Sequence, residues 1–243
     1  DFQLDADLTQ ALNSLSRQQG VTLYMTLLTA FKALLYRYTG QSDIIVGSPF
    51  ANRNATDTEQ LIGFLVNTLV LRTQVTGELK VRELLNRVRK VTSGAYANSN
   101  LPFEQLIQEL QPERDLSYSP FFQAMFALQK QLPSTQSAAG LSWEIGAAGD
   151  LGCSMFDLTL DLVETSTGIE GHFEYNSDLF DRDTIVRMAS NWQTLLAGIV
   201  ANPEQTIDRL PLLAEAEKQA LIDWNQTAGS QYKGIQQLFE AQA

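Results

Sequence analysis

The segment from Thr22 to Tyr38 most constrains the fold, because it predicts a helix that is apolar on nearly every side. Thr22 can cap the start of this helix, and Gly40 follows its end, where glycine is favoured. Its apolar side chains are Leu23, Met25, Leu27, Leu28, Phe31, Leu34 and Leu35. A helix of this kind must be covered on more than one side. The chain is therefore expected to bury it between several neighbouring elements.

The rest of the chain mixes helical and strand periodicities. Amphipathic helices are predicted at 4–20, 80–98, 102–110, 183–201 and 214–224. Strands are predicted at 43–48, 65–73, 121–129, 156–164 and 169–175, with a further one around Trp143. The segment 121–129 fits either period, and its aromatic residues after Pro120 favour a strand. The last two strands form an antiparallel hairpin, and the whole pattern predicts an α/β or α+β sheet layered with helices.

Charge and rare residues exclude several classes of function. The 243 residues include 17 basic and 28 acidic ones, so the net charge of -11 disfavours nucleic acid and anionic membrane as partners. A single cysteine, Cys153, excludes an internal disulfide framework or a cysteine metal cage. No signal peptide or membrane span is recognisable, so a cytoplasmic protein is expected. The missing initial methionine suggests a piece of a longer chain.

The only histidine, His172, leaves one candidate for imidazole chemistry and no multi-histidine metal site. Alternation places it on the polar face of its strand with Glu170 and Glu174. A solvated strand histidine accounts for this pattern, whereas catalysis would need a nucleophile or carboxylate beside it in the fold. The chain contains no GxxxxGK[ST], GxSxG or HExxH motif. From the residues alone, no self-contained catalytic set and no metal site is predicted.

One basic cluster stands out against the acidic background. It lies on the predicted helix 80–98 and consists of Arg82, Arg87, Arg89 and Lys90. A solvated helix face explains it, and a docking face for an acidic partner protein is the alternative.

Several stretches resemble the motifs of one family, in that family's order. Residues 62–72 read IGFLVNTLVLR, 101–104 read LPFE and 114–126 read RDLSYSPFFQAMF. They are followed by FDLTL at 156–160, YNSDLF at 175–180, WNQT at 224–227 and LFEAQ at 238–242. Together these stretches resemble the condensation domain of a nonribosomal peptide synthetase, ending with the linker to an adenylation domain and that domain's first helix.

The resemblance implies a fold like chloramphenicol acetyltransferase, with two similar lobes and the active site between them. The family's catalytic motif, HHxxxDG, belongs to the N-terminal lobe, and this chain has no His-His pair. The resemblance therefore implies one lobe, the C-terminal subdomain, at residues 1–211, a linker at 212–234 and the start of an adenylation domain at 235–243. No catalytic residue is expected in this chain, and the isolated fragment is expected to be inactive.

The implied reaction of the parent enzyme is amide bond formation in antibiotic or other secondary metabolite biosynthesis. Its substrates are donor and acceptor aminoacyl thioesters held on phosphopantetheine arms of carrier proteins. No cofactor is expected to bind this chain directly. The implied partners are the N-terminal lobe, peptidyl carrier proteins and a downstream adenylation domain. A lone lobe would also expose the apolar face meant for its partner, so self-association is expected.

The resemblance also assigns roles to particular residues. Asn67 and Thr68, with Gly63 and Phe64, are expected to line the substrate tunnel, and Gly63 is expected to allow close packing or an unusual dihedral. Residues 49–60 are expected to bridge the tunnel floor. Residues 114–129 are expected to contribute to the strand that crosses between lobes. The lobe-bridging and structural residues are Arg72, Arg114, Asp115, Pro120, Phe122 and Gln123.

Alternative interpretations remain. Asn67 and Thr68 are equally explained as structural polar groups beside the strand ladder, and Arg72 and Arg114 as structural ion-pair formers. An epimerization domain shares the fold, but its VGWFT pattern differs from the IGFLVNT found here. The chain is otherwise explained as a non-catalytic interaction or docking lobe.

Overall fold

A computed structural model describes residues 1–53, 61–112, 119–131, 135–138, 141–144 and 152–225. The chain divides into two compact units, Asp1–Leu212 and Leu213–Ala243. The first unit is built on a six-stranded sheet with the order β1-β8-β7-β4-β2-β3. In that order the strands are β1 (Phe2–Leu4), β8 (Ile169–Tyr175), β7 (Leu158–Glu164), β4 (Ala124–Lys130), β2 (Asp43–Phe50) and β3 (Asn67–Gln74).

The sheet has a parallel centre and antiparallel edges. Strand β4 pairs in parallel with β2 on one side and with β7 on the other. Strand β3 closes one edge antiparallel to β2, and the β7–β8 hairpin with β1 closes the other. The predicted C-terminal hairpin and the strand at 121–129 are thus confirmed, with the second shifted to Ala124–Lys130. Parallel neighbours need crossover connections, and these contain α4 (Val81–Ala97) and α5 (Phe103–Leu110) between β2 and β4, and a separate two-stranded ribbon between β4 and β7.

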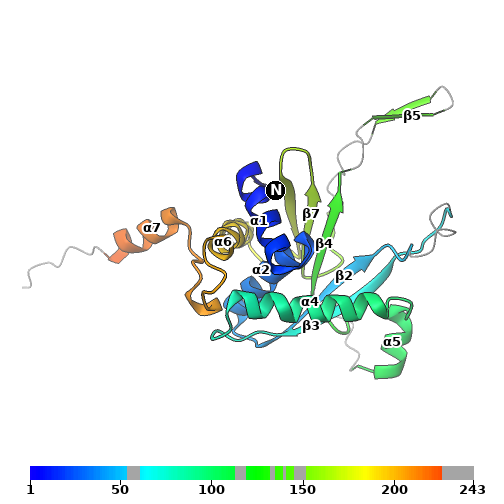
Figure 1. The fold of residues 1–243 in the computed structure, drawn as a ribbon, viewed down its shortest axis with the longest axis horizontal. Helices are drawn as coiled ribbons and strands as arrows, with labels where there is room; N and C mark the ends of the chain where they lie inside the picture. Colours follow the sequence, from blue (N-terminus) through cyan, green and yellow to red (C-terminus); the bar gives the residue numbers. More distant parts are fainter. Residues whose placement is uncertain (54–60, 113–118, 132–134, 139–140, 145–151, 226–243) are drawn as a thin grey trace, which may run out of the picture. The chain divides into compact units, whose positions relative to one another are not determined.

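Helices gather on one side of this sheet (Figure 1). They are α1 (Ala6–Gln19), α2 (Leu23–Thr39), α4 (Val81–Ala97) and α6 (Arg182–Ala201). Helix α2 is central, and α1, α4 and α6 all pack against it. Its N-cap Thr22 accepts a hydrogen bond from the backbone N–H of Met25, and Gly40 ends it with φ 69°. The predicted burial of this helix on more than one side is confirmed.

The main core lies between the helices and one face of the sheet. Alternate strand residues such as Val46, Leu71 and Leu160 point into it, and each is fully buried. The helices contribute Phe31 and Trp192, which are also fully buried. This arrangement of a helical layer on a sheet confirms the predicted two-layer α/β fold.

The remaining elements belong neither to the six-stranded sheet nor to its four main helices. Helix α5 (Phe103–Leu110) follows α4, and a short 3-10 helix, η1 (Ile207–Arg209), follows α6. Strands β5 (Thr135–Ala138) and β6 (Leu141–Glu144) pair only with each other, as a separate two-stranded sheet. The second unit contains α7 (Glu215–Asn225). Among the residues described, no helix is both long and apolar enough to cross a membrane.

Candidate functional site

An aromatic cluster brings together three of the sequence motifs on the sheet face opposite the main helical layer. Phe103 comes from the LPFE stretch, Phe121 and Phe122 from SPFFQ, and Phe156 from FDLTL. The Phe122 ring centroid lies 5.8 Å from that of Phe103 and 5.3 Å from that of Phe156. Phe103 also packs edge-to-face against Phe121, with centroids 6.1 Å apart. Segments that are distant along the chain thus converge on one surface.

Gly47, in the middle of β2, makes this cluster sterically possible. The Phe122 ring lies directly over it, and a Cβ atom built at Gly47 would overlap that ring. Phe122 is only 1% exposed, so it is part of a small second core rather than a surface residue. The sequence suggested Gly63 as the close-packing glycine. Among the described residues no atom lies within 4 Å of a Cβ built at Gly63, and its φ is not positive, so neither close packing nor a left-handed backbone conformation accounts for this glycine there.

Asn67, the first residue of β3, ties a fourth motif to the cluster. Its Nδ2 donates hydrogen bonds to the backbone oxygens of Ser99 (2.9 Å) and Leu101 (2.7 Å). Its Oδ1 accepts from the backbone N–H groups of Thr68 (2.9 Å) and Phe103 (3.1 Å). The side chain therefore joins the start of β3 to the segment that enters α5.

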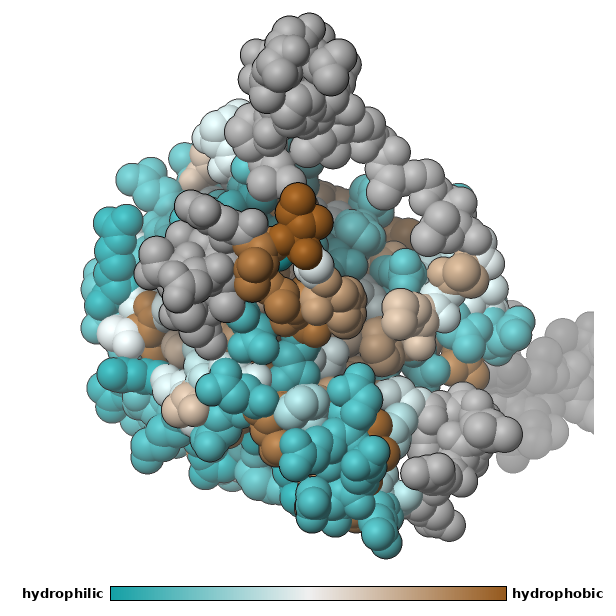
Figure 2. Space-filling model, turned by 90° about the vertical axis from the view of Figure 1, so that its right-hand side faces the viewer, coloured by the Kyte–Doolittle hydropathy of each residue, from teal (hydrophilic) through white to brown (hydrophobic). Residues whose placement is uncertain are grey.

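The residues before Asn67 are strongly exposed. Phe64 is 91% exposed, and Leu61, Ile62 and Val66 are exposed as well. Figure 2 shows apolar side chains gathered in the middle of the face on the right in Figure 1, with hydrophilic ones around them. Exposed apolar groups in one region are typical of surfaces that contact a partner.

Arg72 and Asp43 form a bidentate ion pair across β3 and β2. Arg72 Nε donates to both carboxylate oxygens at 3.0 Å, and its NH2 group lies 2.6 Å from Oδ2. The guanidinium, by hydrogen bonding, holds the pKa of Asp43 below its usual range. The Arg72 side chain is 67% exposed, so solvent weakens this ion pair and the pair adds little to the stability of the fold.

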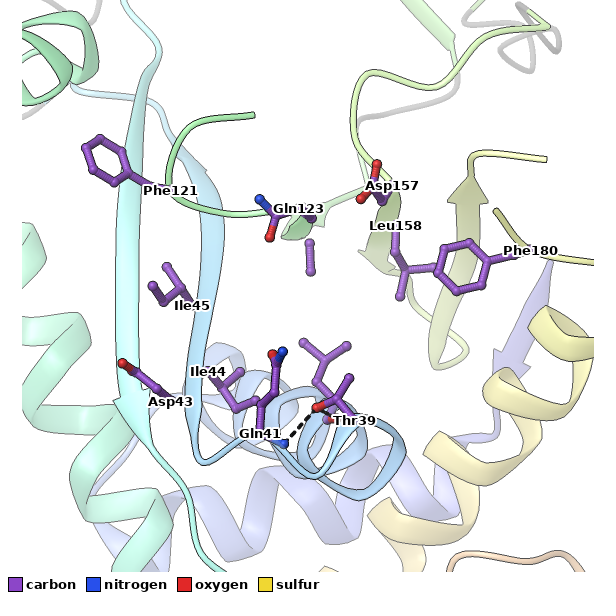
Figure 3. Close-up of a pocket in the computed structure, with 12 residues that line it drawn as sticks. Thr39, Gln41, Asp43, Ile44, Ile45, Phe121, Gln123, Asp157, Leu158 and Phe180 are labelled. Atoms are coloured by element: carbon purple, nitrogen blue, oxygen red, sulfur yellow. Dashed lines mark hydrogen bonds between the residues drawn. The ribbon is translucent and has the colours of Figure 1, made fainter. Parts of the chain in front are cut away.

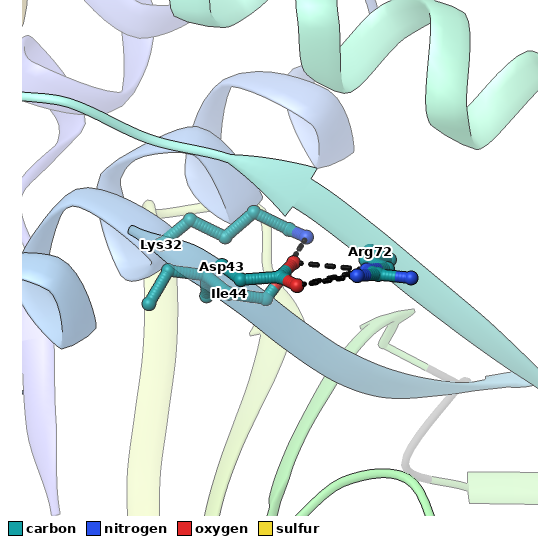
Figure 4. A network of polar contacts seen from close by, with 4 residues as sticks. All are labelled: Lys32, Asp43, Ile44 and Arg72. Atoms are coloured by element: carbon teal, nitrogen blue, oxygen red, sulfur yellow. Dashed lines mark hydrogen bonds and ion pairs between the residues drawn. The ribbon is translucent and has the colours of Figure 1, made fainter. Parts of the chain in front are cut away.

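Lys32 is a buried ionisable side chain that the sequence pattern did not single out. It lies in the middle of α2 with no exposed surface, and its Nζ donates to Leu71 O and, at 2.9 Å, to Thr73 Oγ1. A weaker contact of 3.5 Å reaches Ile44 O, as Figure 4 shows. Burial lowers the pKa of Lys32 from 10.5 to about 7, against the opposing effect of Asp43. A lysine within an all-round apolar helix was the signal that could have found it.

A pocket of about 290 Å³ lies at the other end of the sheet, where β2, β4 and β7 begin (Figure 3). The pocket forms because β4 begins beside Val46, so the residues of β2 before Val46 have no pairing partner on β4. Two carboxylates, Asp43 and Asp157, and two amides, Gln41 and Gln123, line it among apolar walls. Phe121 of the aromatic cluster also lines this pocket, so the pocket adjoins the cluster, whereas Asn67 and Thr68 pair with the last residues of β2 at the opposite end of that strand.

His172 does have a carboxylate beside it. It pairs directly with Asp161 across the β7–β8 ladder, and its Nε2 lies 3.4 Å from Asp161 Oδ2. Hydrogen bonding to Asp161 raises the pKa of His172. The side chain is half exposed, and Glu170 and Glu174 are exposed on the same strand as predicted. Among the described residues, no group of three or more His, Cys, Asp or Glu side chains could hold a metal ion.

The condensation domain family matches this chain over residues 1–222. The chain belongs to the condensation domain family. One of the linear gramicidin synthase proteins of Brevibacillus parabrevis is 51% identical over 225 residues, 92% of this chain and 3% of that protein. Surfactin synthase subunit 1 of Bacillus subtilis is 39% identical over 245 residues, 100% of this chain and 7% of that protein. The chain thus spans only a small part of these relatives.

Solved structures share the fold of this condensation domain. A four-domain nonribosomal peptide synthetase bound to AMP and glycine superposes with a TM-score of 0.81 at 21% identity, over 89% of this chain and 18% of that one. The X-domain from teicoplanin biosynthesis superposes with a TM-score of 0.78 at 23% identity, over 87% of this chain and 48% of that one. The expected chloramphenicol-acetyltransferase-like fold class is confirmed.

The segment 114–129, expected to contribute to the strand that crosses between lobes, contains the first residues of β4, which lies in the centre of this chain's own sheet. That expectation stays a prediction. The β5–β6 ribbon forms a separate two-stranded sheet. Within the same motif, Gln123 Nε2 donates to Ser119 O at 3.1 Å, just after Pro120. Arg114 and Asp115 lie outside the described residues.

The basic cluster on α4 is partly used by contacts within the chain. Arg82 forms a 3.2 Å ion pair with Glu204, and Arg87 donates to Gln74 O at 2.9 Å. Both interpretations of the cluster, a solvated face and a docking face, remain predictions.

Proposed function

We propose that this chain is one lobe of a nonribosomal peptide synthetase condensation domain, which joins two aminoacyl groups by an amide bond. The observation that carries this proposal is the extent of the match. The chain aligns over 87% of its own length with the solved X-domain but covers only 48% of that chain. It covers 47% of the first condensation domain of the calcium-dependent antibiotic synthetase. If the domain has two similar lobes and this chain supplies one of them, the chain should cover about half of such a solved domain.

In the proposed reaction, the amine of the acceptor aminoacyl group attacks the thioester carbonyl of the donor. A C–N bond forms, the C–S bond breaks, and the donor's phosphopantetheine thiol is released with the proton that the amine loses. The family's HHxxxDG histidine would move that proton, and this chain has no His-His pair. The contribution of this lobe is to hold and orient the substrates, which can lower the barrier substantially.

The open sheet face would form one wall of the substrate tunnel. The centre of this face is closed by four uncharged aromatic rings, those of Phe103, Phe121, Phe122 and Phe156. A packed aromatic wall favours productive orientation of tethered substrates. Thr68, Gly63 and Phe64 are proposed to border the tunnel at the end of the sheet where β3 begins.

The β5–β6 ribbon is proposed to bridge the two lobes. Two strands alone are at best marginally stable in water. The ribbon pairs with no strand of the six-stranded sheet, so its outer edges can add to the sheet of the other lobe. Within this proposal the remaining partners are the carrier proteins that deliver the thioesters and a downstream adenylation domain, and the chain works in the cytoplasm.

The test is reconstitution. The chain is combined with the N-terminal half that bears HHxxxDG, and condensation is measured with aminoacyl groups loaded on donor and acceptor carrier proteins. We expect a dipeptidyl carrier product from the combined halves and none from either half alone. Replacing the second motif histidine of the added half by alanine is the matched control and should abolish the product.

Two outcomes would overturn the proposal. Turnover by the 243-residue chain alone would show that catalysis does not need the other half. Combined halves that bind carriers and each other without forming product would favour the docking-lobe alternative.

A further inference from the structure

The Asn67 side chain has its hydrogen-bonding capacity fully used by the protein. A primary amide offers two N–H donors and an oxygen with two acceptor positions. Asn67 gives both donors to Ser99 O and Leu101 O, and its oxygen accepts from the N–H groups of Thr68 and Phe103. All four distances lie between 2.7 and 3.1 Å. No position on this amide remains for a substrate.

Three of these four partners lie in the segment that leads from α4 into α5. The first N–H groups of a helix have no partner within the helix. Helix α5 has Pro102 at its N-cap, which makes no side-chain cap hydrogen bond. Asn67 Oδ1 therefore provides the cap for Phe103, the first residue of α5, from 36 positions earlier in the chain.

The capped residue is also a member of the aromatic cluster. Phe103 packs on Phe121 and Phe122, and Phe122 fills the space above Gly47. The position of the Phe103 ring thus depends on where the backbone of residues 99–103 is held. Asn67 is the side chain that holds this backbone on β3.

We propose that Asn67 is a positioning residue, which fixes the 99–103 segment and the Phe103 ring that shape the tunnel wall, and does not itself contact substrate. This inference rests on the proposed function and replaces the expected tunnel-lining role of Asn67. It also gives a physical reason for the IGFLVNT and LPFE stretches to occur in one chain, since the asparagine of the first caps the helix of the second.

Aspartate at this position distinguishes positioning from substrate contact. Asn67→Asp keeps an acceptor for Phe103 but loses both donors, and it places a carboxylate oxygen beside two carbonyl oxygens. Protonation of that carboxyl at low pH would return one donor. If Asn67 positions the 99–103 segment, Asn67→Asp should therefore loosen that segment as much as Asn67→Ala does at pH 8. The segment of the Asn67→Asp variant should become ordered again towards pH 5.

The first measurement is amide hydrogen exchange on the 243-residue chain for wild type, Asn67→Ala and Asn67→Asp. Asn86→Ala, which removes an exposed asparagine on α4, is the matched control. We expect the protection factors of Phe103 and the first turn of α5 to fall at least about tenfold in both Asn67 variants, with recovery for Asn67→Asp at pH 5. The control should match wild type.

The second measurement is condensation by the reconstituted enzyme. Misplacement by about 1 Å can cost roughly a hundredfold in rate, so kcat of the Asn67 variants should fall by at least about tenfold while KM for the acceptor carrier changes little.

Full protection at Phe103 together with lost activity would overturn the proposal, because Asn67 would then act on substrate directly. Lost protection with unchanged activity would overturn it as well. A wild-type enzyme that forms no product refutes the proposed function instead. The exchange data still decide whether Asn67 holds the 99–103 segment in place.

Discussion

At the scale of single residues, Gly47 decides whether the second face of the sheet can be packed. The Phe122 ring occupies the volume that any side chain at position 47 would need. A ring from one motif and a strand residue 75 positions away must therefore be compatible atom by atom. No local pattern marks Gly47, because its requirement is steric and comes from a distant segment.

We predict that Gly47→Ala destabilises the chain by about 1–3 kcal/mol, because the added methyl group displaces Phe122 from its site. Urea denaturation followed by tryptophan fluorescence measures the change. Gly94→Ala is the matched control, since Gly94 lies in α4 with open space around it. This control should gain about 0.5–1 kcal/mol from the better helix propensity of alanine. Equal effects at both positions would contradict the packing argument.

At the scale of elements, Lys32 ties α2 to the β2–β3 pair. Its partners Leu71 and Thr73 are on β3, up to 41 residues further along the chain. The ammonium group is fully surrounded by protein, so desolvation outweighs the favourable field of Asp43 and lowers its pKa to about 7. The helix is anchored by this polar contact as well as by its apolar sides.

The lowered pKa of Lys32 predicts a definite pH dependence. Between about pH 7 and 10.5 the unfolded chain binds this proton and the folded chain does not, so folded stability rises with pH. The slope from this one group is at most about 1.4 kcal/mol per pH unit. Lys32→Met should remove that contribution, so that the variant gains on wild type as pH falls towards 7.

The measurement is the free energy of unfolding at several pH values from 7 to 10 for wild type and Lys32→Met. Lys90→Met, which changes an exposed lysine on α4, is the control and should run parallel to wild type. Parallel curves for Lys32→Met and wild type would show that Lys32 keeps an ordinary pKa in the folded chain.

At the scale of the whole molecule, the core ends well before the chain does. Every fully buried apolar side chain of the described residues lies between Leu4 and Leu210. The last two, Ile207 and Leu210, are 0% and 3% exposed. Arg37 NH1 also donates to the backbone oxygens of these two residues. The segment after α6 therefore completes the fold of the first unit.

We predict that a chain ending at Leu212 unfolds at the same urea concentration as the full chain, whereas one ending at Asn202 is severely destabilised. The shorter chain loses two core side chains, which cost about 2–5 kcal/mol each. Circular dichroism during urea denaturation compares the three chains. A folded chain ending at Asn202, or an unfolded one ending at Leu212, would contradict this division.

Much of this protein follows from local sequence patterns. The buried α2 helix, its two caps and the β7–β8 hairpin come from periodicity and turn chemistry, which act over a few residues. The family motifs likewise indicate the fold class. The predicted tunnel residues near Thr68 stay predictions, since neighbours from another segment would have to complete that site.

Other features are decided only by the tertiary structure. They are the position of β4 inside the sheet, the seat of Phe122 on Gly47, the partners of Lys32 on β3 and the hydrogen bonds from Asn67 to the segment before α5. Each of them joins segments that are distant along the chain. Such contacts form because burial requires complementary shape and satisfied polar groups across elements. Periodicity shows which face of an element is buried, but only packing of the whole sheet determines which distant residue meets it.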